Sequence, residues 1–244
     1  MTAHVRASAK SEAVAPPSAA RAAADGTPSL AEQYTELSSQ AYAPRRVDIV
    51  LRGLDLIIAG SALLLLSPLL VLLAVATLVT SGTPVLYRGE RVGRAGRVFT
   101  MYKLRTLRPG AETRLGNVYG EELSRRTEEE VTLVGRAARL THIDEVPQLF
   151  NVLRGEMSIV GPRPVRPAFF YRLVEEVPQY WQRLVVRPGV TGFAQTRITR
   201  EDSWEDKLIH DLEYIADRSI RLYLRVLGAT IGRIIRLTFS GRNR

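Results

Sequence analysis

The sequence predicts a predominantly α protein with small β elements (α+β), anchored in a membrane by a proline-broken helix that re-enters the face it left. Three segments predict this class: an apolar run at residues 56–79, a mixed polar stretch after it, and a basic C-terminus with helical periodicity. The chain has no cysteine and only three histidines. These counts exclude a disulfide scaffold, a thiol nucleophile and a cysteine-ligated metal centre, and they argue against a multi-histidine metal site.

Residues 1–44 are predicted to form a disordered tail. They are rich in Ala, Ser and Pro, and they lack a sustained apolar period. They also lack the apolar core of a secretory signal, so export is not expected.

Residues 45–83 are predicted to form a helix, a break and a second helix in the membrane. No charged residue occurs between residues 56 and 87. Because about 20 apolar residues are enough to cross a bilayer as a helix, this run is interpreted as a membrane segment. The alternative is a very apolar core helix of a folded domain.

The flanks of the apolar run favour re-entry over crossing. Short basic segments prefer the cytoplasmic side, and here both flanks are basic. Within the run, Pro68 removes a backbone hydrogen bond and bends the helix, and Ser67 can bond the freed carbonyl. An ordinary kinked spanning helix is the alternative. The flanking arginines are Arg45, Arg46, Arg52, Arg88, Arg91, Arg94 and Arg97.

Residues 84–217 are predicted to form a mixed domain. Two short strands are expected at residues 85–87 and 98–104, around a turn rich in Gly and Arg, and residues 111–135 are charged and helical in part. A further helix is predicted from about residue 145 to 154, with Asp144 as its N-cap and Gly155 as its end.

Asp144 and Glu145 are adjacent carboxylates at the predicted start of that helix. The positive end of a helix stabilises their charge, so Asp144 has the chemistry of a nucleophile and the pair can share attack and metal binding. The alternative is that Asp144 only caps the helix and Glu145 only fills its first turn. Farther on, Arg163 stands between two prolines, either as a rigid phosphate clamp or as part of a Pro-rich connector.

Residues 218–244 carry seven arginines and no acidic residue, which is most of the net charge of +9. At about 100° per residue, five arginines fall on one helical face, with aliphatic residues on much of the remainder. This pattern predicts a basic amphipathic helix on anionic membrane lipid, with a solvated helix or a nucleic-acid arm as alternatives. The five are Arg218, Arg221, Arg225, Arg233 and Arg236.

Taken together, these residues resemble the bacterial sugar transferase family, the monotopic phosphoglycosyl transferases that act on polyprenyl phosphate. The resemblance runs from about residue 52 to 237. Its most specific motif is D-E-x-P-Q-x-x-N-V-L-x-G-x-M-S-x-V-G-P-R-P at residues 144–164. The other motifs are Arg52 with Asp55, Ser67 with Pro68, and residues 83–85, 91–99, 103–106 and 188–195.

The resemblance implies that the re-entrant helix anchors a cytoplasmic catalytic domain at the bacterial inner (cytoplasmic) membrane. It implies transfer of a sugar phosphate from a nucleoside-diphosphate sugar, such as a UDP-sugar, to polyprenyl (undecaprenyl) phosphate, with release of nucleoside monophosphate. Such a step would begin exopolysaccharide or glycoconjugate assembly. Asp144 would form a covalent phosphosugar intermediate, and Glu145 would hold Mg²⁺. Phosphoryl transfer also needs positive charge, which Lys103, Arg105 and Arg163 can supply.

The chain departs from the family pattern after Gln195. The family continues there with an Asn-Gly-Arg-like turn whose arginine contacts the substrate, and in this chain either Arg197 or Arg200 substitutes for it. No nucleic acid partner is expected. The alternative function is that of a non-catalytic membrane-anchored binding protein, which would have no use for Mg²⁺.

Overall fold

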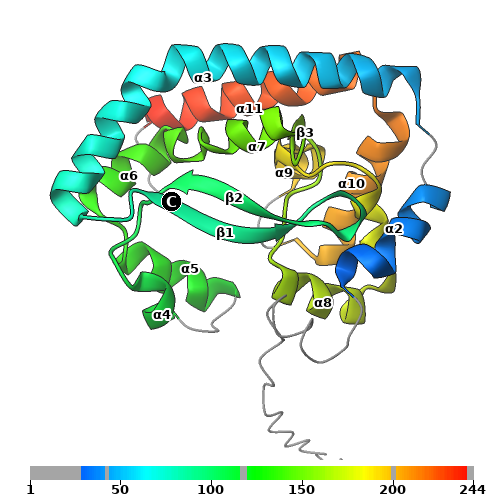
Figure 1. The fold of residues 1–244 in the computed structure, drawn as a ribbon, viewed down its shortest axis with the longest axis horizontal. Helices are drawn as coiled ribbons and strands as arrows, with labels where there is room; N and C mark the ends of the chain where they lie inside the picture. The colour runs from blue at the N-terminus through cyan, green and yellow to red at the C-terminus, as the bar shows by residue number, and fades with distance from the viewer. Residues whose placement is uncertain (1–28, 42–43, 116–119, 199–201, 241–244) are drawn as a thin grey trace, which may run out of the picture.

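The structure is a computed structural model that describes residues 29–41, 44–115, 120–198 and 202–240. A long arched helix, α3 (Arg46–Ser81), covers one side of a mainly helical body, and α11 (Ile220–Ser240) lies along it (Figure 1). Beneath these two helices, β1 (Leu86–Val92) and β2 (Val98–Leu104) form an antiparallel hairpin. The predicted α+β class with small β elements is confirmed.

The remaining elements are shorter helices, 3-10 turns and two short strands. A three-residue 3-10 turn, η1 (Arg94–Gly96), joins the two hairpin strands. The others are α2 (Leu30–Ala41), α4 (Ala111–Leu115), α5 (Gly120–Glu129), α6 (Leu133–Leu140), η2 (Ile143–Glu145), α7 (Gln148–Arg154), β3 (Ser158–Val160), α8 (Pro167–Glu176), η3 (Pro178–Val185), β4 (Gly189–Thr191), α9 (Phe193–Arg197) and α10 (Trp204–Asp217).

Helix α2 corrects the prediction that residues 1–44 form a disordered tail. Ser29 and Glu32 cap its start through reciprocal hydrogen bonds between side chain and backbone. The Tyr34 ring packs edge-on against Phe170 at 5.7 Å between centroids and stacks on Trp181 at 6.2 Å. These aromatic partners lie far along the chain, so local composition could not indicate them. The rest of the predicted tail, residues 1–28 and 42–43, lies outside the described residues.

Helix α3 is long and apolar enough to cross a membrane, judged by length and composition. A break at Pro68 was expected, but α3 is helical from end to end and arches (Figure 1). Pro68 has no N–H to offer the carbonyl of Leu64, four residues earlier. The Ser67 hydroxyl donates to that carbonyl at 2.9 Å, as the sequence predicted, and so the helix continues through the proline.

Asp55 fastens the first half of α3 to the body beneath it. One carboxylate oxygen, Oδ1, accepts hydrogen bonds from the Ser158 hydroxyl at 2.9 Å, the Ile159 N–H at 2.9 Å and the Tyr223 hydroxyl at 3.0 Å. These donors come from β3 and α11. A single buried carboxylate thus joins three elements.

Helix α7 begins at Gln148, three residues later than predicted, and ends at Gly155, as predicted. The predicted N-cap was also wrong: Asp144 lies inside the 3-10 turn η2. Pro147 explains both differences. Because Pro147 has no N–H, the carbonyl of Ile143 accepts instead from Val146 at 3.1 Å, which tightens the chain into a 3-10 turn before α7.

The motif at residues 188–195 contains a short strand. Residues Gly189–Thr191 form β4, which pairs in parallel with β3. A Cβ atom on Gly189 would lie 2.1 Å from the backbone nitrogen of Gly161, so only glycine allows the two segments to approach this closely.

The predicted C-terminal helix is confirmed from Ile220 to Ser240, whereas residues 241–244 lie outside the described residues. For Arg218, the predicted place on the basic face was wrong. Arg218 precedes α11 and is buried, and its Nε donates to Asp48 Oδ1 at 2.6 Å. The other four arginines of the predicted basic face are exposed: Arg221, Arg225, Arg233 and Arg236.

Candidate active site

Asp144 and Glu145 lie in the η2 turn, where α6 ends and α7 begins, against strand β2. Lys103 on β2 reaches across and donates from Nζ to Glu145 Oε1 at 2.6 Å. The Lys103 and Glu145 side chains are partly exposed, while Asp144 is buried. Three of the residues singled out in the sequence therefore meet in one place.

The Asp144 carboxyl is poised to exchange its proton near neutral pH. Burial raises its pKa to about 6, and the adjacent charge of Glu145 adds to the rise, while Lys103 and Arg139 act in the opposite direction. A carboxylate of this basicity is a better nucleophile than an exposed aspartate, and it is largely ionised above that pH.

The neighbouring Glu145 is shifted the other way. Burial acts to raise its pKa, but the charges of Lys103 and Arg163 and the hydrogen bond from Lys103 outweigh burial and lower it. Two adjacent carboxyl groups with pKa values displaced in opposite directions are a pattern typical of a division of chemical roles.

Asn151 holds this site together, although the sequence reasoning assigned it no role. It is fully buried, its Oδ1 accepts from the Tyr102 N–H at 3.1 Å, and its Nδ2 donates to the Thr100 carbonyl at 2.7 Å. These bonds fasten α7 to β2 and fix Lys103 relative to the η2 turn. The signal was present in the long motif, where a side-chain amide occurs among apolar residues of a helix.

Arg139 is a second residue that the sequence reasoning missed. Its Nε donates to the Thr106 hydroxyl at 2.9 Å, and its charge acts on the Asp144 carboxyl. A basic residue five positions before Asp144 was the available signal. Gly135 permits this contact, because a Cβ there would lie 2.2 Å from the Thr106 carbonyl oxygen.

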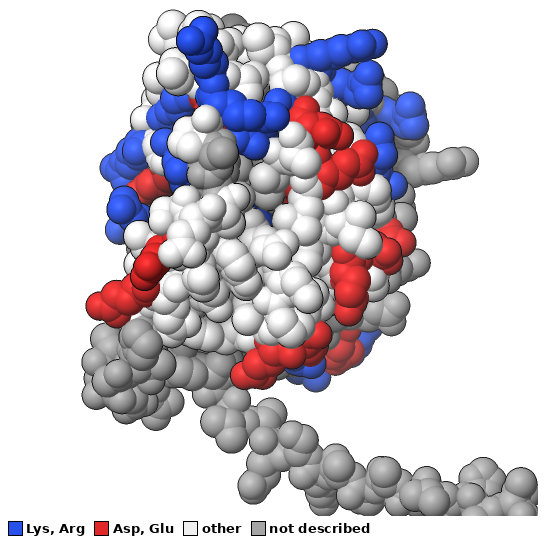
Figure 2. All heavy atoms as spheres, turned by 90° about the vertical axis from the view of Figure 1, so that its right-hand side faces the viewer, with Lys and Arg blue, Asp and Glu red and all other residues white. Residues whose placement is uncertain are grey.

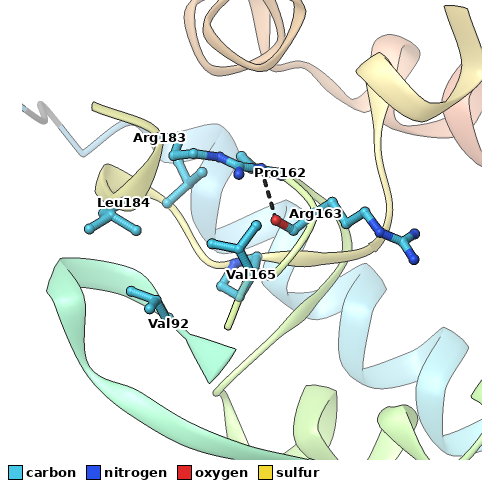
Figure 3. A pocket seen from close by; sticks show the side chains of 9 residues that line it. Val92, Pro162, Arg163, Val165, Arg183 and Leu184 are labelled. Atoms are coloured by element: carbon cyan, nitrogen blue, oxygen red, sulfur yellow. Dashed lines mark hydrogen bonds between the residues drawn. The ribbon is translucent and has the colours of Figure 1, made fainter. Parts of the chain in front are cut away.

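The Arg163 guanidinium is exposed, and its positive charge acts on Glu145. Its backbone carbonyl accepts a hydrogen bond from Arg183 Nη2 at 2.8 Å, and Arg183 is itself ion-paired to Asp211 at 2.8 Å. Figure 3 shows the Arg163 side chain pointing away from the small hollow that Val92, Val165 and Leu184 help to line. The rigid connector therefore presents Arg163 outward.

The other predicted phosphate contacts are not joined to the carboxylate pair. Arg105 is buried under the end of α3, where its Nη2 donates to the carbonyls of Ser81 and Gly82, both at 2.7 Å. Arg197 lies over the Phe193 ring and pairs with Glu213 at 3.6 Å. Arg200 lies outside the described residues. A substrate contact by any of these three arginines stays a prediction.

The metal prediction meets only a partial set of protein ligands. The described residues contain no group of three or more His, Asp or Glu side chains that could hold a metal ion. Mg²⁺, however, keeps several waters and is often bound by one or two carboxylates together with substrate phosphates. Asp144 and Glu145 are donors of that kind, so the site fits such an ion.

The chain was compared with known protein families and with individual proteins. The family described as "Bacterial sugar transferase" matches residues 46–237. A UDP-N-acetylgalactosamine-undecaprenyl-phosphate N-acetylgalactosaminephosphotransferase of Aeromonas hydrophila is 36% identical over 189 residues, which cover 76% of this chain and 44% of that protein. An undecaprenyl-phosphate glucose phosphotransferase of Komagataeibacter xylinus is 40% identical over 172 residues, which cover 67% and 31%.

A third relative is closer in length. A UDP-glucose:undecaprenyl-phosphate glucose-1-phosphate transferase of Caulobacter vibrioides is 36% identical over 192 residues, 76% of this chain and 69% of that protein. The chain thus spans less than half of the Aeromonas and Komagataeibacter relatives it matches.

Proposed function

The chain belongs to the bacterial sugar transferase family, and we propose that it is a phosphoglycosyl transferase that moves a sugar phosphate from a nucleoside-diphosphate sugar to undecaprenyl phosphate. The observation that carries this proposal is the buried Asp144 beside Glu145, with Lys103, Arg139 and Arg163 acting on the pair. The relatives' names supply the substrate class. The transfer would be the first membrane step in building an exopolysaccharide or glycoconjugate.

The proposed reaction has two displacements at one phosphorus atom. In the first, an oxygen of the Asp144 carboxylate attacks the sugar-linked phosphorus, the bond to the nucleoside monophosphate breaks, and that monophosphate leaves. In the second, a phosphate oxygen of the polyprenyl phosphate attacks the same phosphorus, and the Asp144 carboxylate is released. Lys103, Arg139 and Arg163 offset the negative charge of the phosphoryl oxygens. Two steps suit substrates of which one is water-soluble and the other a lipid.

Glu145 would hold the Mg²⁺ ion of this proposal, with the remaining ligands from water and substrate phosphate. When bound, the ion would neutralise charge on the phosphate oxygens. The hydrogen bond from Lys103 keeps the Glu145 carboxylate ionised and turned toward the site.

We further propose that α3 re-enters the cytoplasmic face of the bacterial inner membrane. Both ends of α3 are bound to the same body. At its start, Arg45 donates to the carbonyls of Ala216 and Arg218 at 3.1 and 2.6 Å, and at its end Arg105 holds the carbonyls of Ser81 and Gly82. A helix crossing a hydrocarbon layer of about 30 Å would deliver its ends to opposite sides.

The distribution of charge supports the same orientation. Figure 2 shows Lys and Arg gathered toward the top, the side of α3 and α11, with much of the Asp and Glu lower down. The exposed arginines of α11 suit anionic lipid headgroups. Because the chain lacks cysteine, single substitutions Arg46→Cys and Arg97→Cys provide unique labelling positions. Both should react with an impermeant thiol reagent from the same side of the membrane, and reaction from opposite sides would reject re-entry.

The experiment that tests the activity measures nucleoside monophosphate release by the purified chain, with undecaprenyl phosphate and a panel of nucleotide-sugar donors. Asp144→Asn should lower the rate by about a thousandfold or more, since it removes the nucleophile. The exposed Glu129→Gln is the matched control and should retain activity. A chelator should stop release in the native chain. Turnover retained by Asp144→Asn would reject the nucleophile, and no release with any donor would favour the non-catalytic binding protein.

A further inference from the structure

One face of strand β1 carries polar groups that the proposed reaction does not yet use. Tyr87, Gly89 and Arg91 alternate along the strand on its half-buried face, while Arg88 and Glu90 point to the exposed side. Tyr87 lies directly opposite Lys103 of β2 in the antiparallel register. Side chains opposite one another lie on the same face, so this row begins beside the lysine that binds Glu145.

Gly89 leaves room for the two larger side chains to converge. A Cβ atom placed on Gly89 would lie 2.3 Å from the Tyr87 hydroxyl oxygen and 2.9 Å from Arg91 Nη1. The Tyr87 hydroxyl and the Arg91 guanidinium therefore meet above the glycine, and the arginine is folded back along the strand toward Lys103.

Two more guanidinium groups lie beside this point. The Val92 N–H donates to the Val165 carbonyl at 2.9 Å, which places the end of β1 against the segment that contains Arg163 and Arg166. Arg166 Nη2 donates to the Tyr87 hydroxyl at 3.5 Å.

No acid in the described part of the chain forms an ion pair with any of the three arginines, Arg91, Arg163 or Arg166. Burial lowers the pKa of Arg91, and the neighbouring positive charges of Arg166 and Arg163 lower it further. Like charges gathered without a directly ion-paired acid are a cost to the fold that a bound anion would relieve.

We propose that Tyr87, Arg91 and Arg166, together with Arg163, form a phosphate subsite for the nucleoside-monophosphate half of the donor. This inference rests on the proposed function, because the sugar-linked phosphate would lie at Asp144 and Lys103, next to the Tyr87 end of this row. The subsite would hold the second phosphate of the donor and keep it as the leaving group departs. Guanidinium groups suit this task, since they bind phosphate oxygens through paired N–H donors.

The position of the subsite favours the nucleotide over the lipid phosphate. In Figure 1 β1 lies on the far side of β2 from α7 and α3. A phosphate attached to a membrane lipid would approach from the α3 side. The water-soluble donor has access to the opposite side of the hairpin, where β1 lies.

The test compares two exposed arginines. One contacts Tyr87 on the half-buried face of β1, and the other lies on the exposed face of the same strand. Arg166→Gln removes a subsite charge, and Arg88→Gln removes one from the exposed face of β1. Binding of UMP to the full chain is measured calorimetrically, without turnover. We expect the Kd for UMP to rise about tenfold or more in Arg166→Gln and to stay unchanged in Arg88→Gln. The KM for the nucleotide sugar should rise with it, and the KM for undecaprenyl phosphate should not.

Gly89→Ala is the second variant, because it keeps every charge and displaces the Tyr87 hydroxyl and the Arg91 guanidinium. It should weaken UMP binding as Arg166→Gln does. Equal UMP affinity in Arg166→Gln and Arg88→Gln would overturn the subsite, and so would a native chain that turns over donor without binding UMP. A rise confined to the KM for undecaprenyl phosphate would assign these arginines to the lipid phosphate instead. UMP binding by a native chain that lacks turnover would leave the subsite standing and reject the activity.

Discussion

Two aspartates, Asp55 and Asp144, are both buried but differ in their hydrogen-bond partners. Asp55 is 3% exposed and Asp144 is 8% exposed, so both have been withdrawn from water to a similar degree. Asp55 accepts three hydrogen bonds on one oxygen and lies 3.8 Å from Arg52. In the part of the chain that the structure describes, no side chain donates a hydrogen bond to Asp144, and its neighbour is another carboxylate.

The difference separates a structural carboxylate from the one that we propose as the nucleophile. The fold supplies Asp55 with partners that replace part of its lost hydration, and each partner belongs to an element that must stay in place. Asp144 has the charges of Lys103 and Arg139 at a distance and one hydrogen bond from its own backbone N–H. A folded protein tolerates a poorly satisfied buried charge chiefly where that charge has chemical work to do.

The largest effect on stability is expected at Asp55. Asp55→Ala would leave the Tyr223 and Ser158 hydroxyls and the Ile159 N–H without their acceptor, and we expect a loss of about 3–5 kcal/mol in the free energy of unfolding. Thermal unfolding in detergent measures this loss. Asp55→Asn keeps an acceptor oxygen in the same position and is the matched control, with a smaller loss. If the two variants were equally stable, the hydrogen bonds would not be what holds α3 to the body.

Substitution of Asp144 is expected to raise the stability of the fold at neutral pH, where substitution of Asp55 lowers it. Its pKa is raised from 3.8 to about 6, so the folded chain holds this proton more tightly than the unfolded chain does. Ionisation of Asp144 therefore costs stability as the pH rises from about 4 to 6, by at most about 3 kcal/mol at neutral pH. Asp144→Asn should remove this cost. The variant should unfold at a higher temperature than the native chain at pH 7.5, and at nearly the same temperature at pH 4.

The measurement is made with a chelator present, so that bound metal does not stabilise the native carboxylate. Glu129→Gln, an exposed position, is the control and should show no pH-dependent difference. A native chain more stable than Asp144→Asn at pH 7.5 would mean that Asp144 has partners of the kind that Asp55 has, and the contrast between the two aspartates would fail.

The sequence pointed to the carboxylate pair Asp144 and Glu145 but not to the residues that support it. Asp144 and Glu145 were found because they begin a long and specific motif, and Lys103 because it begins another, at residues 103–106. The supporting contacts depend on pairings between residues far apart in sequence. Asn151 bonds a backbone group 49 residues away, and Arg139 bonds a hydroxyl 33 residues away. Local pattern carries no information about such partners until the hairpin has been placed against α6 and α7.

In the fold, too, elements set by local properties were predicted correctly, and elements set by distant contacts were not. The strand at residues 98–104 and the end of α7 at Gly155 follow from alternation and from a glycine in the left-handed region, which are local properties. Helix α2 was missed because its stability comes from contacts with Phe170 and Trp181. Strand β1 was expected to stop at Tyr87, since residues 88–91 have no apolar side chain. Its continuation to Val92 is set by pairing with β2.

The smallest predicted effect lies in the apolar middle of α3, where Ser67 gives a polar backbone group a local partner as the fold does for Asp55. The Ser67 hydroxyl bonds the Leu64 carbonyl that Pro68 leaves free. Ser67→Ala should lower the free energy of unfolding by about 1 kcal/mol, because that carbonyl then has no donor in an apolar environment. In a Pro68→Ala background the backbone N–H of residue 68 can serve the same carbonyl, so Ser67→Ala should then cost little. A double-mutant cycle followed by thermal unfolding measures this coupling, and additive effects would show that the hydroxyl does not compensate for the proline.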